Sequence, residues 1–127
     1  MKQTVKLLEA GFKSSSGKTP EFLSFVEVFK KEFSNELRTI GATNIVFNVG
    51  HFYISGFFTT LAGEIFYFSL PDVRDLGHSI LNYPDSCMSK LMYRTAKDYN
   101  DYTGGMNRFV KIELDMIVKM CWYFKIV

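Results

Sequence analysis

The sequence predicts an α+β domain in which a long N-terminal amphipathic helix packs on a twisted, mostly antiparallel sheet with a long C-terminal strand. Three observations lead to this prediction. A capped segment near the N-terminus has helical spacing, three short aromatic and β-branched runs follow it, and the C-terminus alternates apolar with polar residues. At 127 residues the chain is long enough for one core, so we predict a single domain over 1–127.

The helix is predicted over residues 20–40. Thr19 is a favourable N-cap, and Pro20 occupies the first helical position, where its missing N–H costs nothing. Gly41 marks the end of the helix. The apolar stripe with helical spacing consists of Phe22, Phe25, Val26, Phe29, Phe33, Leu37 and Ile40.

Three strands are predicted next, over residues 43–50, 51–60 and 64–70. Gly50 and the turn Leu61-Ala62-Gly63-Glu64 separate these runs, which indicates an antiparallel meander. The segment 71–86 contains two prolines and a glycine, and we expect it to be irregular with at most a helical turn.

The C-terminal segment 110–126 alternates in a period of two, which predicts a long strand with a bend or bulge. Seventeen residues exceed the ordinary length of a strand, so two consecutive strands would also fit. A buried terminal helix is the competing interpretation. Its apolar face would be formed by Leu114, Ile117, Val118 and Cys121.

The charge distribution excludes some classes of partner. Net charge is +2, with an excess of two positive charges in residues 1–42, three negative charges in 43–85 and three positive charges in 86–127. This disfavours an acidic DNA mimic and a DNA-binding protein that depends on many phosphate contacts. No apolar run reaches the length of a membrane span and the N-terminus is too charged for a secretory signal. We therefore expect a cytoplasmic protein without membrane contact.

The sequence shows no convincing catalytic or metal-binding motif. Gly17-Lys18-Thr19 ends like a phosphate-binding loop, but five residues instead of four separate Gly11 from Gly17. Cys87 and Cys121 lack metal-ligand spacing and are expected to be buried free thiols. The two histidines, His51 and His78, are expected to be structural. We predict a protein that is not an enzyme and holds no cofactor or metal.

Residues 93–107 are the most polar and turn-rich part of the chain, with three tyrosines and a Gly-Gly pair. One interpretation is a short helix pairing Arg94 with Asp98, in a connector whose tyrosines cover the sheet. Another is a recognition surface, and a third is an enzyme site with an anion-binding arginine and an aspartate base. Our candidate binding residues are Arg94, Asp98, Tyr99, Asp101, Tyr102, Gly104, Gly105 and Asn107, with Asp72 and Arg74 of the Asp–Arg pair after residue 70 as weaker candidates.

The segments "GHFYISGFF", "YFSLPDVRD" and "YRTAKDYNDYTGGMN" resemble, in this order, a family of short accessory proteins of Gram-positive phages and conjugative elements. The resemblance covers most of residues 1–110 and leaves out the C-terminal segment. It implies a small cytosolic protein of a mobile element, of a kind that often antagonises host defence, as anti-CRISPR proteins do. The resemblance supplies no catalytic residues.

The expected function is therefore binding and inhibition of a host defence complex, most plausibly a CRISPR effector nuclease with its guide RNA. The alternative is a small nucleic-acid-binding protein for phage or plasmid replication or transfer. In that case exposed aromatic residues of the sheet would stack on bases, flanked by Lys111, Lys119 and Lys125. The sequence does not set the oligomeric state.

Overall fold

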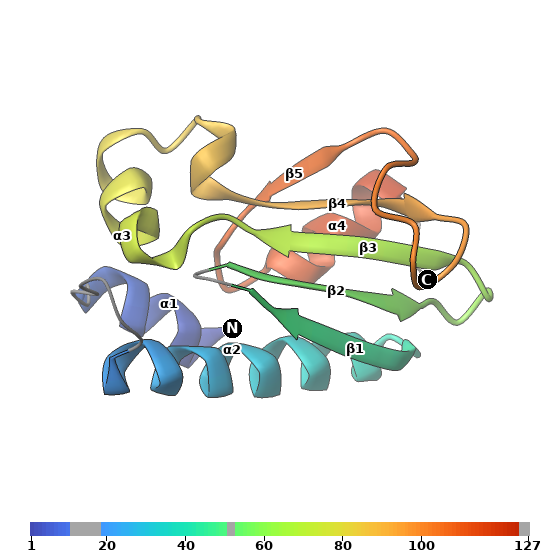
Figure 1. Ribbon diagram of the computed structural model, residues 1–127, viewed down its shortest axis with the longest axis horizontal. Helices are drawn as coiled ribbons and strands as arrows, with labels where there is room; N and C mark the ends of the chain where they lie inside the picture. The colour runs from blue at the N-terminus through green and yellow to red at the C-terminus, as the bar shows by residue number, and fades with distance from the viewer. Residues whose placement is uncertain (11–18, 51–52, 125–127) are drawn as a thin grey trace.

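The computed structural model describes residues 1–10, 19–50 and 53–124 and has the α+β architecture that the sequence predicts (Figure 1). The loop Lys13–Lys18, with most of the phosphate-loop-like motif, and His51 lie outside the described residues. The elements are α1 (Lys2–Ala10), α2 (Pro20–Thr39), β1 (Thr43–Val49), β2 (Ile54–Thr59), β3 (Ile65–Leu70), α3 (Val73–Asn82), the 3₁₀ turn η1 (Cys87–Ser89), β4 (Lys90–Ala96), β5 (Arg108–Lys111) and α4 (Met116–Phe124).

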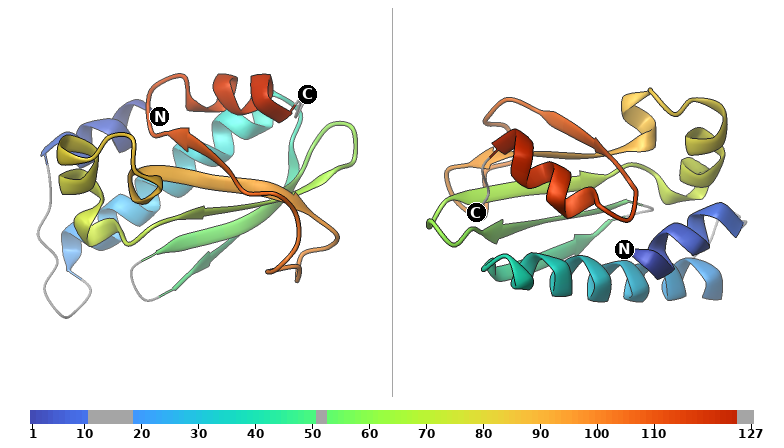
Figure 2. Two further views of the ribbon diagram at one scale, coloured as in Figure 1. Left: turned by 90° about the horizontal axis from the view of Figure 1, so that it is seen from above. Right: turned by 180° about the vertical axis from the view of Figure 1, so that it is seen from behind.

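The five strands form one antiparallel sheet in the order β1-β2-β3-β4-β5, so each strand pairs with its neighbour in the sequence. The sheet is not strongly twisted. Helices α2 and α4 cover one face, and the segment between β4 and β5 folds over the other (Figures 1 and 2). We call the face away from α2 and α4 the open face.

Helix α2 begins and ends where the sequence predicts. The Thr19 hydroxyl accepts a hydrogen bond from the N–H of Phe22, and Pro20 opens the helix. Gly41 follows the C-cap Ile40 with φ of 90°, a conformation that glycine adopts without strain. Six of the seven residues of the predicted apolar stripe are buried against the sheet, and Ile40 is half-buried.

The core between α2 and the sheet is dominated by phenylalanine. The ring centroids of Phe33 and Phe68 are 4.7 Å apart, and Phe47 meets the ring of Phe68 edge-on at 5.5 Å. Such tilted and edge-to-face pairs contribute stability beyond the burial of their area. The fully buried phenylalanines are Phe22, Phe25, Phe29, Phe33, Phe57, Phe58, Phe66 and Phe68, of which Phe57 alone faces the open side.

Helix α1 was not predicted and packs beside α2. Its first turn is capped by Glu32 of α2, whose carboxylate accepts hydrogen bonds from the N–H of Gln3 and the N–H and hydroxyl of Thr4. An isolated helix of nine residues is marginal in water, so its order depends on this docking. Burial opposes the ionised form of Glu32, but these hydrogen bonds outweigh it and lower the pKa of the carboxyl group.

The prediction of one long C-terminal strand is wrong. Strand β5 covers only Arg108–Lys111, and the chain then turns into α4, as in the alternative interpretation. A single strand would place the apolar residues at even-numbered positions on one buried face. Three of them are instead exposed to solvent, namely Leu114, Val118 and Trp122. Among the described side chains of α4, Met116, Ile117 and Met120 are buried, with helical spacing. The alternative interpretation is therefore right about the helix but wrong about its apolar face, because Leu114 and Val118 are exposed.

The segment after β3 is more regular than predicted, because it contains helix α3. The Asp72 carboxylate caps this helix by accepting the N–H of Arg74 at 3.0 Å. Within the described residues, no helix combines the length and apolar character that crossing a membrane requires.

Candidate binding face on the open side of the sheet

The open face consists of rows of side chains that run across the strands. In an antiparallel sheet, residues paired between strands point to the same side. One row consists of Val46, Phe57, Tyr67 and Arg94, and the next row of Asn48, Ser55, Ser69, Met92 and Phe109. We call the second set the open row.

Two tyrosines of the loop after β4 cover the first row, and we call Tyr99 and Tyr102 the tyrosine cap. The ring of Tyr99 stacks on Phe57 with centroids 5.4 Å apart and 28° between the planes. Tyr102 meets Phe57 edge-on at 5.4 Å and Tyr67 at 5.8 Å. One interpretation of the sequence placed this segment in a short helix; the structure brings the two tyrosines together on Phe57 without a helix.

The hydroxyl groups of the cap reach the edge strand β1. The Tyr99 hydroxyl donates a hydrogen bond to the carbonyl oxygen of Asn44 at 2.8 Å. Because its one hydrogen is used there, the Thr59 hydroxyl, 2.7 Å away, donates to the Tyr99 oxygen. The side-chain amide of Asn48 donates to the Tyr102 hydroxyl at 3.3 Å. Tyr99 is half-buried, whereas Tyr102 is 53% exposed. Tyr99 therefore fixes the loop, and Tyr102 presents most of its ring to solvent.

Arg94 lies on the open face but is only 2% exposed. Its guanidinium carbon is 4.5 Å from the centre of the Tyr67 ring, which is a cation–π arrangement. It donates hydrogen bonds to the carbonyl oxygens of Thr95 at 3.1 Å and Asp101 at 2.7 Å, and its charge is 4.0 Å from the Asp101 carboxylate. The predicted Arg94–Asp98 helical pair is therefore wrong, because β4 continues to Ala96 and the partner is Asp101.

The Asp101 carboxylate organises the loop. It accepts hydrogen bonds from the backbone N–H groups of Lys97 at 2.9 Å, Thr103 at 3.2 Å and Gly104 at 2.9 Å. A Cβ on Gly104 would lie 2.7 Å from this carboxylate, so the close approach requires glycine. Gly105 has φ of 80°, and a Cβ there would lie 2.7 Å from the carbonyl oxygen of Thr95. Both glycines thus serve the loop conformation.

Hydrogen bonds from backbone N–H groups lower the pKa of the Asp101 carboxyl group below its ordinary value. The bond from Lys97 has the largest effect and that from Thr103 the next largest, and the N–H of Gly104 and the charge of Arg94 contribute less. A lowered folded-state pKa contributes stability that is fully present above the unfolded-state pKa, about 3.9, and is lost as pH falls through the folded-state value. The wild type should therefore have a higher urea midpoint of unfolding than Asp101→Asn at pH 7 and 5. At pH 3 this difference should be smaller, because it is lost as pH falls below about 4.

Asp98→Asn is the matched control for this pH series. The Asp98 carboxylate accepts one backbone N–H, from Asn100 at 2.8 Å, which an amide oxygen can also accept. The difference in urea midpoint between Asp98→Asn and the wild type should change less with pH than the difference between Asp101→Asn and the wild type. An Asp101→Asn variant whose difference from the wild type is the same at all three pH values would contradict the assigned role.

The other candidate residues do not all join this site. Asn107 is exposed and lines a hollow of about 310 Å³ with Tyr93, Arg108 and Phe109. Asp72 and Arg74 form an ion pair at 2.5 Å where β3 ends and α3 begins. The loop after β4 lies at the opposite end of β3, next to Ile65, since Ile65 pairs with Ala96. The Asp72–Arg74 pair therefore lies at the other end of the sheet from the tyrosine cap.

Sequence reasoning missed the residues on which the cap rests, namely Phe57, Tyr67, Asn44 and Thr59. The strand alternation could have indicated Phe57 and Tyr67. Successive side chains of a strand point to opposite faces, so these two residues face away from the core side that holds Phe58, Phe66 and Phe68. An aromatic residue on the outer side of two adjacent strands indicates that something covers it.

The open row beside the cap has no charged side chain, and it is partly apolar at its β5 end, where Phe109 is 41% exposed. In the row beyond it, Lys90 donates to the carbonyl oxygen of Asp85 at 3.2 Å and Lys111 lies 3.7 Å from the Asp85 carboxylate. Both lysines at this end of the face thus lie near Asp85, but only Lys111 is close to its carboxylate.

The described residues contain no cluster of three or more His, Cys, Asp or Glu side chains suited to a metal ion. The expectation of buried thiols is wrong for Cys87, which is exposed, while Cys121 is half-buried and burial raises its pKa. His78 lies 3.1 Å from the side-chain amide of Asn82, through Nδ1.

Comparisons with protein-family models, with characterised proteins and with solved structures find no match for this chain.

Proposed function

We propose that the protein binds a partner protein through the tyrosine cap and the open row, without catalysing a reaction. The observation that carries this proposal is the fixed position of the cap. Tyr99 is held by two hydrogen bonds and a stacked ring, so Tyr102 is presented from an ordered loop. A rigid aromatic residue contributes contact area at a low entropic cost, and tyrosine is enriched among the residues that dominate binding energy.

The charges around the face favour a protein over a nucleic acid as the partner. The arginine of this face is buried, Lys111 lies 3.7 Å from the Asp85 carboxylate, and Lys90 donates to the backbone carbonyl oxygen of Asp85. Lys119, another lysine of the nucleic-acid alternative, pairs with Glu113 at 2.6 Å and Asp115 at 3.5 Å. Binding to a nucleic-acid backbone depends on cations that are available to phosphate groups.

The exposed apolar groups around the cap extend the surface that a partner would contact. A specific interface buries about 800 Å² on each partner, and aromatic residues and methionine are enriched in it. The exposed members of this surface are Val46 at 41%, Tyr102 at 53%, Met106 at 67% and Phe109 at 41%.

The family resemblance supports a specific form of this proposal. The partner would be an RNA-guided nuclease of a CRISPR system, and the protein would act as an anti-CRISPR inhibitor in the cytoplasm of a bacterial host of the mobile element. Inhibition would follow from covering a surface of the nuclease or blocking a conformational step. The net charge of +2 disfavours mimicry of DNA charge.

Replacing Tyr102 with alanine is expected to weaken binding to the partner by more than about 1 kcal/mol while the fold is retained, because most of this ring is exposed. Binding is measured by calorimetry and folding by circular dichroism. Tyr83→Ala is the matched control, since Tyr83 is 63% exposed but lies after α3, away from the cap. Equal affinities of Tyr102→Ala and the wild type would show that the cap is not the binding surface.

The partner itself is tested by capturing proteins on the full chain from a lysate that contains a CRISPR effector, with and without nuclease treatment, followed by mass spectrometry and a DNA-cleavage assay. Stoichiometric capture of the effector that survives nuclease treatment, together with loss of cleavage, supports the proposal. Capture that disappears with the nucleic acid would favour a nucleic-acid-binding protein instead.

A further inference from the structure

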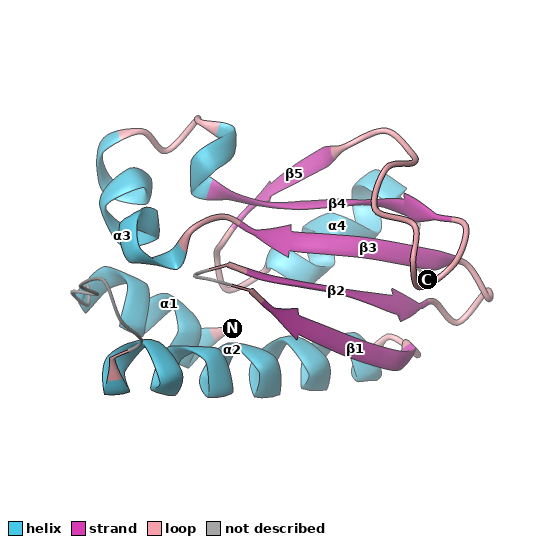
Figure 3. Ribbon diagram, in the orientation of Figure 1, coloured by secondary structure: helices cyan, strands magenta, loops and turns pink. Residues whose placement is uncertain are grey.

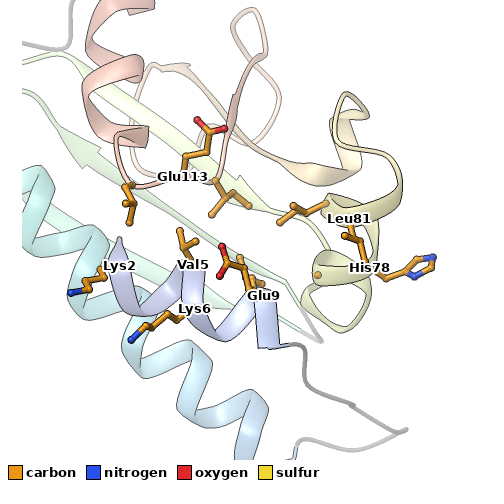
Figure 4. A pocket seen from close by; sticks show the side chains of 12 residues that line it. Lys2, Val5, Lys6, Glu9, His78, Leu81 and Glu113 are labelled. Atoms are coloured by element: carbon orange, nitrogen blue, oxygen red, sulfur yellow. The ribbon is translucent and has the colours of Figure 1, made fainter.

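The structure contains a second candidate site, a pocket of about 690 Å³ between α1, α3 and the turn that joins β5 to α4 (Figure 4). The helices α1 and α3 that line it lie at the end of the sheet where β3 leads into α3, whereas the loop after β4 lies at the other end (Figure 3). Its volume falls in the range of about 300–1,000 Å³ that is typical of small-molecule sites.

The walls of the pocket are apolar. Leu81 and Leu114, at its rim, are 81% and 63% exposed, so apolar surface remains accessible there. The remaining apolar side chains that line it are Val5, Leu8, Ile80 and Ile112.

A close contact between two helices limits the pocket on one side. A Cβ on Gly77 would lie only 2.7 Å from the carbonyl oxygen of Leu8, so the glycine allows α3 to approach the backbone of α1. Helices α1 and α3 are thus packed against each other on this side of the pocket.

One charged group is directed across the pocket. The Glu9 carboxylate projects over the gap beside Val5, whereas the ammonium groups of Lys2 and Lys6 extend away from it (Figure 4). The His78 ring also extends outward, and the Glu113 carboxylate is paired with Lys119 at 2.6 Å. An apolar pocket with one carboxylate at its mouth complements a ligand with an apolar body and a positive head.

We infer that this pocket binds a small cationic amphiphile, with the apolar chain between α1 and α3 and the ammonium group at Glu9. The inference does not depend on the proposed function of the open face, because the two sites share no residues. Burial of the chain supplies the affinity, and Glu9 supplies the preference for a positive over a negative head.

The test is an NMR titration of the full chain with decylammonium, decanoate and ethylammonium, below the concentrations at which micelles form. Decylammonium should shift the amide signals of Val5, Leu8 and Ile80 and bind about threefold more tightly than decanoate, as expected for one exposed ion pair. Ethylammonium has the charge without the chain and should cause no shift. Shifts confined to other parts of the molecule, or equal affinities for decylammonium and decanoate, would overturn the inference.

Two variants make the test specific. Glu9→Lys should reverse the preference in favour of decanoate, while Glu27→Lys, the same charge change on the exposed face of α2, should leave it unchanged. Leu81→Ser should weaken both long-chain probes about fivefold without unfolding, because Leu81 is exposed. An unchanged preference in Glu9→Lys, or unchanged affinities in Leu81→Ser, would also contradict the site.

Discussion

Replacing Gly56 with alanine is expected to lower the free energy of unfolding by about 3 kcal/mol, because strand β2 has no room for a side chain at this position. A Cβ would overlap the carbonyl oxygen of Val46 in β1 and lie 2.8 Å from the ring of Phe68 in β3. Both neighbours belong to paired strands, and Phe68 is fully buried, so relief requires the sheet to move. The measurement is urea unfolding followed by far-UV circular dichroism.

Gly63→Ala is the control for this substitution. Gly63 has φ of 87° in the turn between β2 and β3, but a Cβ there meets no atom within 4 Å. Gly63→Ala should therefore lower the free energy of unfolding by only about 1 kcal/mol, the cost of holding alanine in the left-handed backbone region. If Gly56→Ala cost no more than Gly63→Ala, the close approach of β1 to β2 would be wrong.

Replacing Arg94 with alanine is expected to destabilise the protein by about 3 kcal/mol, because it leaves the carbonyl oxygens of Thr95 and Asp101 without their donor and removes a buried side chain that packs on the Tyr67 ring. The guanidinium joins the Tyr67 ring, the carbonyl oxygen of Asp101 and the Asp101 carboxylate, so its loss should also release the loop that carries the tyrosine cap. Urea unfolding measures the first effect, and hydrogen exchange of the Thr103 and Gly104 amides measures the second.

Arg94→Lys separates charge from geometry. Lysine keeps the positive charge but lacks the planar fork that reaches two carbonyl oxygens while lying over an aromatic ring. Its destabilisation should therefore be intermediate, about 1.5 kcal/mol. An alanine variant that is as stable as the wild type, with unchanged exchange of the loop amides, would show that Arg94 does not hold the loop.

Helix α2 and the strands β1 to β3 were predictable, whereas α1 was not, because local signals and tertiary structure agree in α2 and the meander. Thr19, Pro20 and Gly41 set the limits of α2, and its apolar stripe has a single period. The strands of the meander were recognised from their aromatic content, although β2 begins only at Ile54. Propensity, capping and burial all favour the same structure in this region.

The C-terminal segment was predicted wrongly because its composition fits both periods. Apolar residues occupy so many positions between Val110 and Trp122 that a strand face and a helix face can both be drawn. The choice between strand and helix depends on which of these residues pack against the core. In the structure Leu114, Val118 and Trp122 do not, and they are exposed. Exposed apolar residues are common on protein surfaces, so hydrophobicity alone does not identify the buried set.

Helix α3 and the site show a different limit of sequence reasoning. Gly77 lies within α3, where glycine is unfavourable, and its compensation is a contact with Leu8 far away in the sequence. Arg94 looked like an exposed helical residue, but strand pairing places it next to Tyr67. Segment 93–107 was correctly singled out as unusual, yet the structure uses most of its polar groups to fix the loop itself.

The order of the strands has a consequence for how the two sites come into existence during folding. Because each strand pairs with its sequence neighbour, the sheet can grow strand by strand, although the pairing of β3 with β4 must close the connection that contains α3 and η1. The contact of Leu8 with Gly77 instead joins distant parts of the chain. The open face is therefore built from strands that follow one another in the sequence, whereas the pocket exists only when the N-terminal helix docks on a distant part of the chain.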